Sequence, residues 1–263
     1  MGGKISGRVE KDLIGRIKNA GTILYFLDYD GTLTAIRKKP HLARLDKRTK
    51  IVLKKLSRKT GAKVFIISGR SLKDVKNLVG LKPLYYIGNH GIELEGPALR
   101  YLDANAGALR ASIAKIYRAV KRELDIKGVR VENKTYTLSV HYRLARGTKA
   151  EVIKKKLFSC AYDFLKRGEI NITGGKKVFE VRPKARWDKG SIVKWVIKKT
   201  KPKKPLLVVI GDDRTDEDAF RVVGRKDISI LVSKKTKSTF ARYRLPSPRE
   251  VIEFLENAAG ASR

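Results

Sequence analysis

The sequence predicts an α/β fold in which a doubly wound parallel sheet forms the core and an α+β domain is inserted into it. Residues 22–30 and 205–211 form largely apolar runs. The first run ends in acidic residues and the second is followed by them. Such runs are typical of strands buried on both faces of a parallel sheet. Segments with helical spacing separate such runs, as in a doubly wound fold. Residues 135–143 instead alternate strictly between apolar and polar side chains, which predicts a sheet with one covered face.

The first part of the chain alternates helix and strand. Val9, Leu13 and Ile17 are spaced four apart and predict a short amphipathic helix before the first strand. Asp46 stands where a later helix needs an N-cap. The further elements expected here are a strand at 62–70, a helix at 71–80 and a short strand at 85–91.

The middle and the last part of the chain have different patterns. The middle is the expected insertion, and its polar strand residues, Ser139 and His141 among them, are expected on the open face. Its elements are helix 108–124, strand 135–143, helix 149–166, a hairpin around Gly174 and Gly175, and strand 177–183. The last part returns to parallel-sheet rhythm, with strands at 205–210 and 227–233 and a final helix at 247–259. The expected domains are therefore a core made of 1–96 and 184–263, and an insertion, 97–183.

Composition limits the class of protein. A chain of 263 residues with 42% hydrophobic content can bury a substantial core. Cys160 is the one cysteine, so an intrachain disulfide is excluded. The first residues lack the apolar stretch of a signal peptide, and no apolar run is long enough to cross a bilayer. We therefore expect a cytoplasmic protein without a membrane partner, and a monomer.

The formal net charge of +35 is the unusual bulk property. Such a charge attracts anions and raises the alternative of a nucleic-acid-binding protein on an inactive enzyme fold. However, the basic residues are spread over every segment, and no nucleic-acid-binding module accompanies them. A solvated basic surface is the preferred interpretation, and no nucleic-acid partner is expected.

Polar residues end the apolar runs and are expected to converge, because ligands of open parallel sheets bind beyond the carboxyl ends of the strands. Alone, a motif such as Asp-x-Asp-Gly is usually a turn. Together, several acids without paired bases predict a site for Mg²⁺, which takes carboxylate oxygens along with water and phosphate. The converging residues are Asp28, Asp30, Ser68, Arg70, Asn89, His90, Asp212 and Asp213.

With these motifs the sequence resembles the haloacid dehalogenase (HAD) superfamily of phosphohydrolases. The motifs are DYDGTL, Ser68 in ISGR, Lys189 at the start of a helix, and GDDRTDEDAF, in that order. The resemblance implies that Asp28 is the nucleophile and Asp30 the general acid and base, with Ser68 and Lys189 binding phosphate. It also implies Mg²⁺ held by Asp28, the Asp30 carbonyl and Asp212, with Asp213 and Asp216 as further ligands or neighbouring acids.

Within that superfamily the chain is similar to the trehalose-6-phosphate phosphatase family. The matching features are SGR, GNHGIELEGP, ENK followed by SVHYR, GKKVFEVRP, WDKG and the full GDDRTDEDAF. The resemblance implies that the insertion is a cap over a sugar. The substrate contacts it implies in the cap are Glu132, Lys134, Arg143, Lys176, Glu180 and Arg182, while Arg70, Asn89 and His90 are candidates near the phosphate. His141 by itself is interpreted as a structural histidine.

The function implied is Mg²⁺-dependent hydrolysis of trehalose 6-phosphate through an aspartyl-phosphate intermediate. Carboxylate attack on a phosphate dianion requires positive charge on the equatorial oxygens, and Mg²⁺ and Lys189 are the groups implied to supply it. The alternative within the enzyme class is another sugar phosphate, such as a glucosylglycerol, glucosylglycerate or sucrose phosphate.

Overall fold

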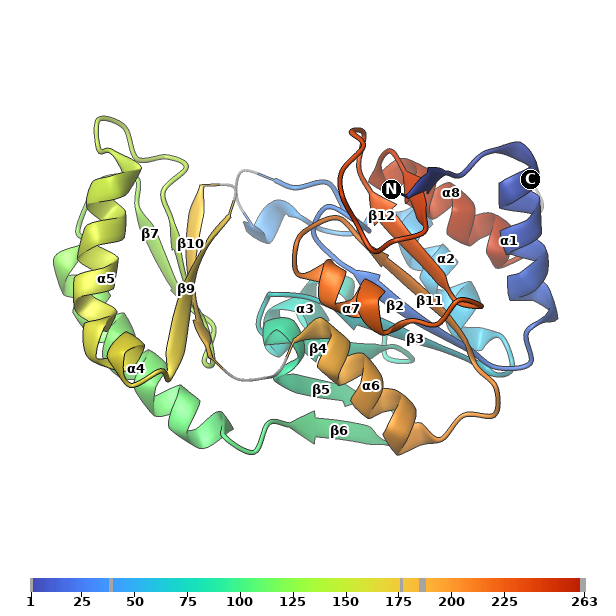
Figure 1. Cartoon of the computed structure of the whole chain (residues 1–263), viewed down its shortest axis with the longest axis horizontal. Helices are drawn as coiled ribbons and strands as arrows, with labels where there is room; N and C mark the ends of the chain where they lie inside the picture. Colours follow the sequence, from blue (N-terminus) through green and yellow to red (C-terminus); the bar gives the residue numbers. More distant parts are fainter. Residues whose placement is uncertain (1, 38–39, 176, 185–187, 261–263) are drawn as a thin grey trace. The chain divides into compact units, whose positions relative to one another are not determined.

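A computed structural model describes residues 2–37, 40–175, 177–184 and 188–260 of the chain (Figure 1). Lys176, expected to bind substrate, lies outside these described residues. The chain divides into two compact units, one formed by Met1–Tyr101 with Trp187–Arg263 and one by Leu102–Arg186. The strand Leu99–Leu102 belongs to the sheet of the larger unit, so this sheet continues past residue 96, where the sequence analysis placed the boundary.

The larger unit contains a mostly parallel sheet. In the described part of the chain its order is β1-β13-β12-β11-β2-β3-β4-β5-β6, parallel from β1 to β4 and antiparallel between β4 and β5. The strands are β1 (Gly3–Lys4), β2 (Ile23–Asp28), β3 (Ala62–Ile67), β4 (Tyr85–Gly88), β5 (Glu93–Gly96), β6 (Leu99–Leu102), β11 (Leu206–Gly211), β12 (Ile228–Val232) and β13 (Tyr243–Leu245).

Helices cover both faces of this sheet. They are α1 (Gly7–Asn19), α2 (Lys47–Arg58), α3 (Leu72–Val79), α6 (Lys189–Thr200), α7 (Asp216–Val222) and α8 (Pro248–Ala258), with 3₁₀ turns η1 (Pro40–Leu42) and η2 (Asn89–Gly91). Alternate residues of β2 face opposite cores. Tyr25 packs with residues of α1, α2, α3 and α8, whereas Phe26 packs with residues of α6 and α7. The predicted doubly wound α/β fold is confirmed.

Local sequence signals set several helix ends in the larger unit. The side chain of Asp46 accepts a hydrogen bond from the backbone N–H of Thr49 at 2.7 Å and so caps α2, as predicted. Leu13 and Ile17 of α1 are buried, but Val9 is 40% exposed and does not belong to the buried stripe. No helix in the described part of the chain combines the length and apolar character that crossing a membrane requires.

The smaller unit is a four-stranded antiparallel sheet of order β7-β8-β10-β9, with two helices on one face (Figure 1). Its elements are α4 (Ala106–Glu123), β7 (Arg130–Asn133), β8 (Leu138–His141), α5 (Ala150–Lys166), β9 (Ile170–Gly175) and β10 (Val178–Pro183). Leu138, Val140 and Val181 point into the core that the helices cover. This unit therefore has the predicted one-sided sheet.

Two details of the smaller unit differ from the prediction. The predicted hairpin is present between β9 and β10, but Gly174 and Gly175 pair with Phe179 and Val178 inside its ladder. Ser139, expected on an open face, is fully buried. The physical reason is that long charged side chains on the polar face bond to one another and to Ser139, so they cover the strand themselves.

Candidate active site

The predicted acids and Lys189 meet at the carboxyl edge of the parallel sheet. Asp28 is the last residue of β2, Asp212 follows the neighbouring strand β11, and Ser68 follows β3 on the other side. Lys189 is the first residue of α6, a helix capped by Asp188, whose side chain accepts a hydrogen bond from the Ser191 N–H at 2.7 Å. Asp28, Ser68, Lys189 and Asp212 are all buried.

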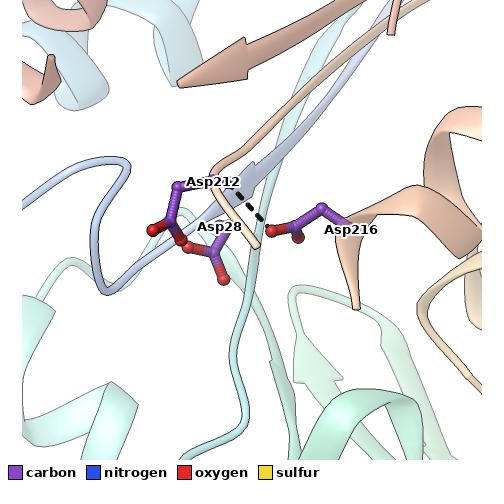
Figure 2. Close-up of side chains that lie close together, drawn as sticks. All are labelled: Asp28, Asp212 and Asp216. Carbon is purple, nitrogen blue, oxygen red and sulfur yellow. Dashed lines mark hydrogen bonds between the residues drawn. The ribbon is translucent and has the colours of Figure 1, made fainter. Parts of the chain in front are cut away.

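Three buried carboxylates form a cluster at this edge. Asp28, Asp212 and Asp216 each offer an oxygen within 4.8 Å of the other two. Figure 2 shows these three side chains close together. Asp216 also fixes the loop before α7, because its Oδ2 accepts from the backbone N–H groups of Asp212 and Asp213 at 3.0 Å each. The loop thus holds the Asp212 carboxylate beside the end of β2.

Lys189 connects two members of the cluster. Its Nζ donates to Asp28 Oδ1 at 2.7 Å and to Asp216 Oδ1 at 2.6 Å. Burial lowers the pKa of Lys189, but the charges of Asp216 and Asp28 outweigh burial and raise this pKa well above its usual value. The Lys189 ammonium is therefore a permanent positive charge in direct contact with Asp28.

The cluster carries more acid than one lysine neutralises. Burial raises the pKa of Asp28 well above its usual value; Lys189 lowers it, and Asp216 and Asp212 raise it further. Burial likewise raises the pKa of Asp216, to about 6. Asp28 Oδ2 is buried and has no hydrogen-bond partner in the described part of the chain. An unpartnered carboxylate oxygen among excess acids is a donor set that fits a hard divalent cation such as Mg²⁺.

Beside the cluster, the buried guanidinium of Arg70 forms an ion pair with Asp30, whose side chain is 35% exposed. Arg70 Nε donates to Asp30 Oδ2 at 2.6 Å and its NH2 group to Asp30 Oδ1 at 2.8 Å. Its NH1 group reaches Asp74 of α3 at 2.7 Å, and NH2 also donates to the Pro40 carbonyl at 2.9 Å. Arg70 was predicted to contact substrate; here its guanidinium binds two carboxylates and orients Asp30.

Ser68, Asn89 and His90 lie together after β3 and β4. Ser68 Oγ accepts from the Arg70 N–H at 3.1 Å, and its carbonyl accepts from the His90 N–H at 3.0 Å. Asn89 Nδ2 donates to Glu93 Oε1 at 2.7 Å, and both Asn89 and His90 have positive φ, at 47° and 59°. Sequence reasoning missed Glu93, which also accepts from the Leu72 N–H at 2.9 Å and ties η2 to α3.

Two residues complete the edge. The Asp213 carboxylate is not one of the three clustered acids, and its Oδ1 accepts from Thr215 N and Oγ1, each at 2.7 Å. Lys237, after β12, donates from Nζ to the Asp212 carbonyl at 3.3 Å. Sequence reasoning missed Lys237, and the only signal was a lysine-rich segment after a strand of the parallel sheet.

Gly31 lets Asp212 approach the end of β2. Its φ is +96°, and a Cβ there would lie 2.3 Å from Asp212 Oδ2. We expect Gly31→Ala to lower the free energy of unfolding by about 2 kcal/mol or more and to displace the Asp212 carboxylate. Urea unfolding, with Mg²⁺ binding measured alongside, checks this.

The matched control for that prediction is Gly15→Ala. Gly15 lies inside α1 with open space where a Cβ would stand, so this change is expected to stabilise the protein by about 0.5–1 kcal/mol. Equal effects of the two substitutions would contradict a specific role for Gly31.

The smaller unit carries a row of polar residues across its sheet. Register pairs Glu132 with Ser139, Ser139 with Glu180, and Glu180 with Thr173, so these four side chains share one face. We call this face of the sheet the polar face. It includes the other residues of each strand whose side chains point to the same side of the sheet. Its further members used below are Arg130, His141 and Arg182.

Glu180 is the centre of one network on the polar face. Its Oε1 accepts from Lys134 Nζ at 2.9 Å and from Ser139 Oγ at 3.3 Å. Its Oε2 accepts from Arg182 Nε at 2.8 Å and from the Arg182 NH2 group. Arg143 lies beyond the end of β8 and is exposed. The structure thus brings together Lys134, Glu180 and Arg182 of the predicted cap residues.

Glu132 is the centre of a second network. Its Oε2 lies 3.1 Å from His141 Nε2 and 3.1 Å from the Arg130 NH2 group. The hydrogen bond with His141 is the main cause that lowers the pKa of Glu132 to about 2; burial opposes it, and Lys134 and Arg130 add to it. Glu132 is therefore a carboxylate at neutral pH.

Comparison with known proteins identifies similar sequences. The trehalose-phosphatase family model matches residues 26–249. Trehalose 6-phosphate phosphatase RA3 of Zea mays is 35% identical over 256 residues, which covers 90% of this chain and 70% of that protein. Trehalose-phosphate phosphatase B of Arabidopsis thaliana is 34% identical over 249 residues, covering 89% of this chain and 65% of that protein. The chain thus spans about two thirds of the length of these relatives.

Solved structures share the fold. The C-terminal domain of trehalose-6-phosphate phosphatase from C. albicans has a TM-score of 0.83 at 24% identity, with both chains covered completely. Trehalose-6-phosphate phosphatase of Aspergillus fumigatus has a TM-score of 0.69 at 25% identity, again over both complete chains. The chain therefore shares its fold with these two solved structures.

Proposed function

The chain belongs to the trehalose-phosphatase family, a family of phosphatase enzymes, and on this premise we propose that it hydrolyses trehalose 6-phosphate to trehalose and phosphate. The observation that carries the proposal is the contact between Lys189 and Asp28. A buried ammonium lies 2.7 Å from one carboxylate oxygen, and the other oxygen, Oδ2, has no hydrogen-bond partner among the residues that the structure describes. That arrangement suits a carboxylate nucleophile for phosphoryl transfer.

In this proposal the Asp28 carboxylate attacks phosphorus in line and displaces the sugar oxygen, which forms an aspartyl phosphate. Lys189 and Ser68 bind the oxygens of the transferred group. Asp30 protonates the leaving sugar oxygen and then takes a proton from the water that hydrolyses the aspartyl phosphate. Arg70, which donates to both oxygens of the Asp30 carboxylate, would orient the ionised form that takes the proton from water.

Mg²⁺ is the cofactor of the proposal. Asp28, Asp212 and the Asp30 carbonyl would hold it, with Asp213 and Asp216 as further ligands or neighbouring acids. When bound, the cation neutralises charge on the phosphoryl oxygens. The raised pKa values of Asp28 and Asp216 support a bound cation. They indicate that both carboxylates are destabilised as anions when Lys189 is their one buried counter-charge among the described residues.

The polar face of the smaller unit is the proposed sugar-binding surface. A disaccharide has many hydroxyl groups and little apolar area, so charged side chains with several donors and acceptors are suitable partners. The proposed contacts are Glu132, Lys134, Arg143, Lys176, Glu180 and Arg182, with Asn89 and His90 nearer the phosphate. Thr173 adds an exposed hydroxyl group to the same row.

Phosphate release from a panel of monoesters tests this function. We expect kcat/KM for trehalose 6-phosphate to exceed that for p-nitrophenyl phosphate, and for sucrose, glucosylglycerol and glucosylglycerate phosphates, by at least about tenfold, because the polar face recognises one disaccharide. EDTA is expected to abolish activity, and Mg²⁺ to restore it. A flat profile across the panel would contradict the trehalose assignment, and full activity in EDTA would contradict the cofactor.

A further inference from the structure

We infer that His141 is a positioning residue for sugar binding: it holds Glu132 through one oxygen, Oε2, so that the other, Oε1, accepts a hydrogen bond from a sugar hydroxyl. The inference rests on the proposed function and adds to it a residue that does not itself touch the sugar. The sequence alone suggested only a structural histidine. The structure shows that His141 acts on one named atom of a proposed substrate contact.

Both donors to Glu132 bind the same oxygen. His141 Nε2 and the Arg130 NH2 group lie 3.1 Å from Oε2, whereas Oε1 has no hydrogen-bond partner in the part of the chain that the structure describes. Because Glu132 is a carboxylate at neutral pH and can only accept, Nε2 of His141 carries the hydrogen. The side chains of Glu132 and His141 are 24% and 29% exposed, so water or a sugar hydroxyl can reach them.

Glu180, the other acid on the polar face, is bound differently. Lys134 and Ser139 occupy Oε1, and Arg182 occupies Oε2. Both of its oxygens therefore serve protein donors, and its side chain is only 15% exposed. Of these two acids, Glu132 is the one with an oxygen that no protein donor occupies in the described residues.

The position of His141 explains the direction in which Glu132 is held. Register pairs His141 with Arg130, so both donors belong to the row next to that of Glu132. Lys134 adds electrostatic stabilisation to the Glu132 carboxylate from the other end of β7. Without His141, Oε2 keeps only Arg130, whose side chain is 53% exposed and therefore a weaker anchor. The carboxylate can then turn towards Lys134, and Oε1 is lost to the sugar.

Kinetics of His141→Ala on two substrates test the inference. With trehalose 6-phosphate we expect KM to rise about tenfold and kcat to change less than about twofold, since a hydrogen bond from a charged group is lost outside the reacting centre. With p-nitrophenyl phosphate, which has no sugar, neither constant should change. His141→Gln keeps an N–H donor and should return KM to within about threefold. Arg122→Ala, on the exposed side of α4, is the control and should change nothing.

A double-mutant cycle separates positioning from a direct or structural role. If His141 acts through Glu132, then Glu132→Ala raises KM and adding His141→Ala raises it no further. Additive effects, equal losses on both substrates, or failure of Gln to restore KM would overturn the inference. The results that would overturn the inference can be seen only in the variant enzymes. Failure of the proposed function appears already in the unmodified enzyme, as a lack of preference for trehalose 6-phosphate over p-nitrophenyl phosphate.

Discussion

Replacing Asp28 with Asn is expected to lower kcat for trehalose 6-phosphate by about a thousandfold or more, because an amide oxygen cannot take the place of a carboxylate nucleophile. Steady-state phosphate release with saturating Mg²⁺ measures this. Asp12→Asn, an exposed acid on α1, is the matched control and should keep full activity.

The same substitution should leave the fold intact. Burial and the neighbouring acids destabilise the Asp28 anion, as its raised pKa indicates, and the Asn oxygen can still accept the hydrogen bond from Lys189. We therefore expect the midpoint of thermal unfolding in EDTA to be unchanged or higher. Loss of activity accompanied by unfolding would show that Asp28 is structural, and retained activity would exclude it as the nucleophile.

Lys189→Met is expected to be severe for stability as well as for activity. It removes the one buried ammonium that contacts Asp28 and Asp216 in the described structure and leaves two buried carboxylates without it. Breaking a buried ion pair by removing one partner costs about 3–5 kcal/mol. Urea unfolding in EDTA measures the loss. Lys194→Met, on the exposed side of the same helix, is the control and should lie within about 0.5 kcal/mol of the unmodified protein.

The loss caused by Lys189→Met should depend on pH in a definite direction. Asp216 already has a raised pKa of about 6, and Lys189 is a cause that lowers this pKa, so removing Lys189 raises it further. A carboxyl group with a raised folded-state pKa stabilises the protein below its unfolded pKa, and this stability is lost as pH rises through the folded value. The defect should therefore be larger at pH 8 than at pH 5. An equal defect at both pH values would contradict the electrostatic explanation.

Much of the fold follows from local sequence patterns. The apolar run before Asp28, the cap at Asp46 and the alternation of Leu138 and Val140 are each consequences of neighbours within a few residues, and the structure confirms them. Because parallel strands end at one edge, the meeting of Asp28 with Asp212 could also be predicted.

Contacts between distant side chains could not be predicted from the residues alone. Arg70 and Asp30 are 40 positions apart, and no pattern in either segment indicates that the guanidinium binds both carboxylate oxygens. Ser139 was expected on an open face but is buried. Alternation predicts the face of the strand on which a residue lies, but not the length or direction of the side chains that cover that face. The use of one Glu132 oxygen by His141 likewise depends on register between β7 and β8.

The most direct test of the central claim is to locate the phosphoryl group during turnover. The enzyme is mixed with trehalose 6-phosphate and Mg²⁺, quenched in acid, and digested with trypsin; residues 19–37 form the peptide that contains Asp28 and Asp30. Phosphorylation of this peptide at Asp28 is expected, and none in Asp28→Asn. Phosphorylation at another residue, or turnover of the Asp28→Asn enzyme at the normal rate, would contradict the central claim.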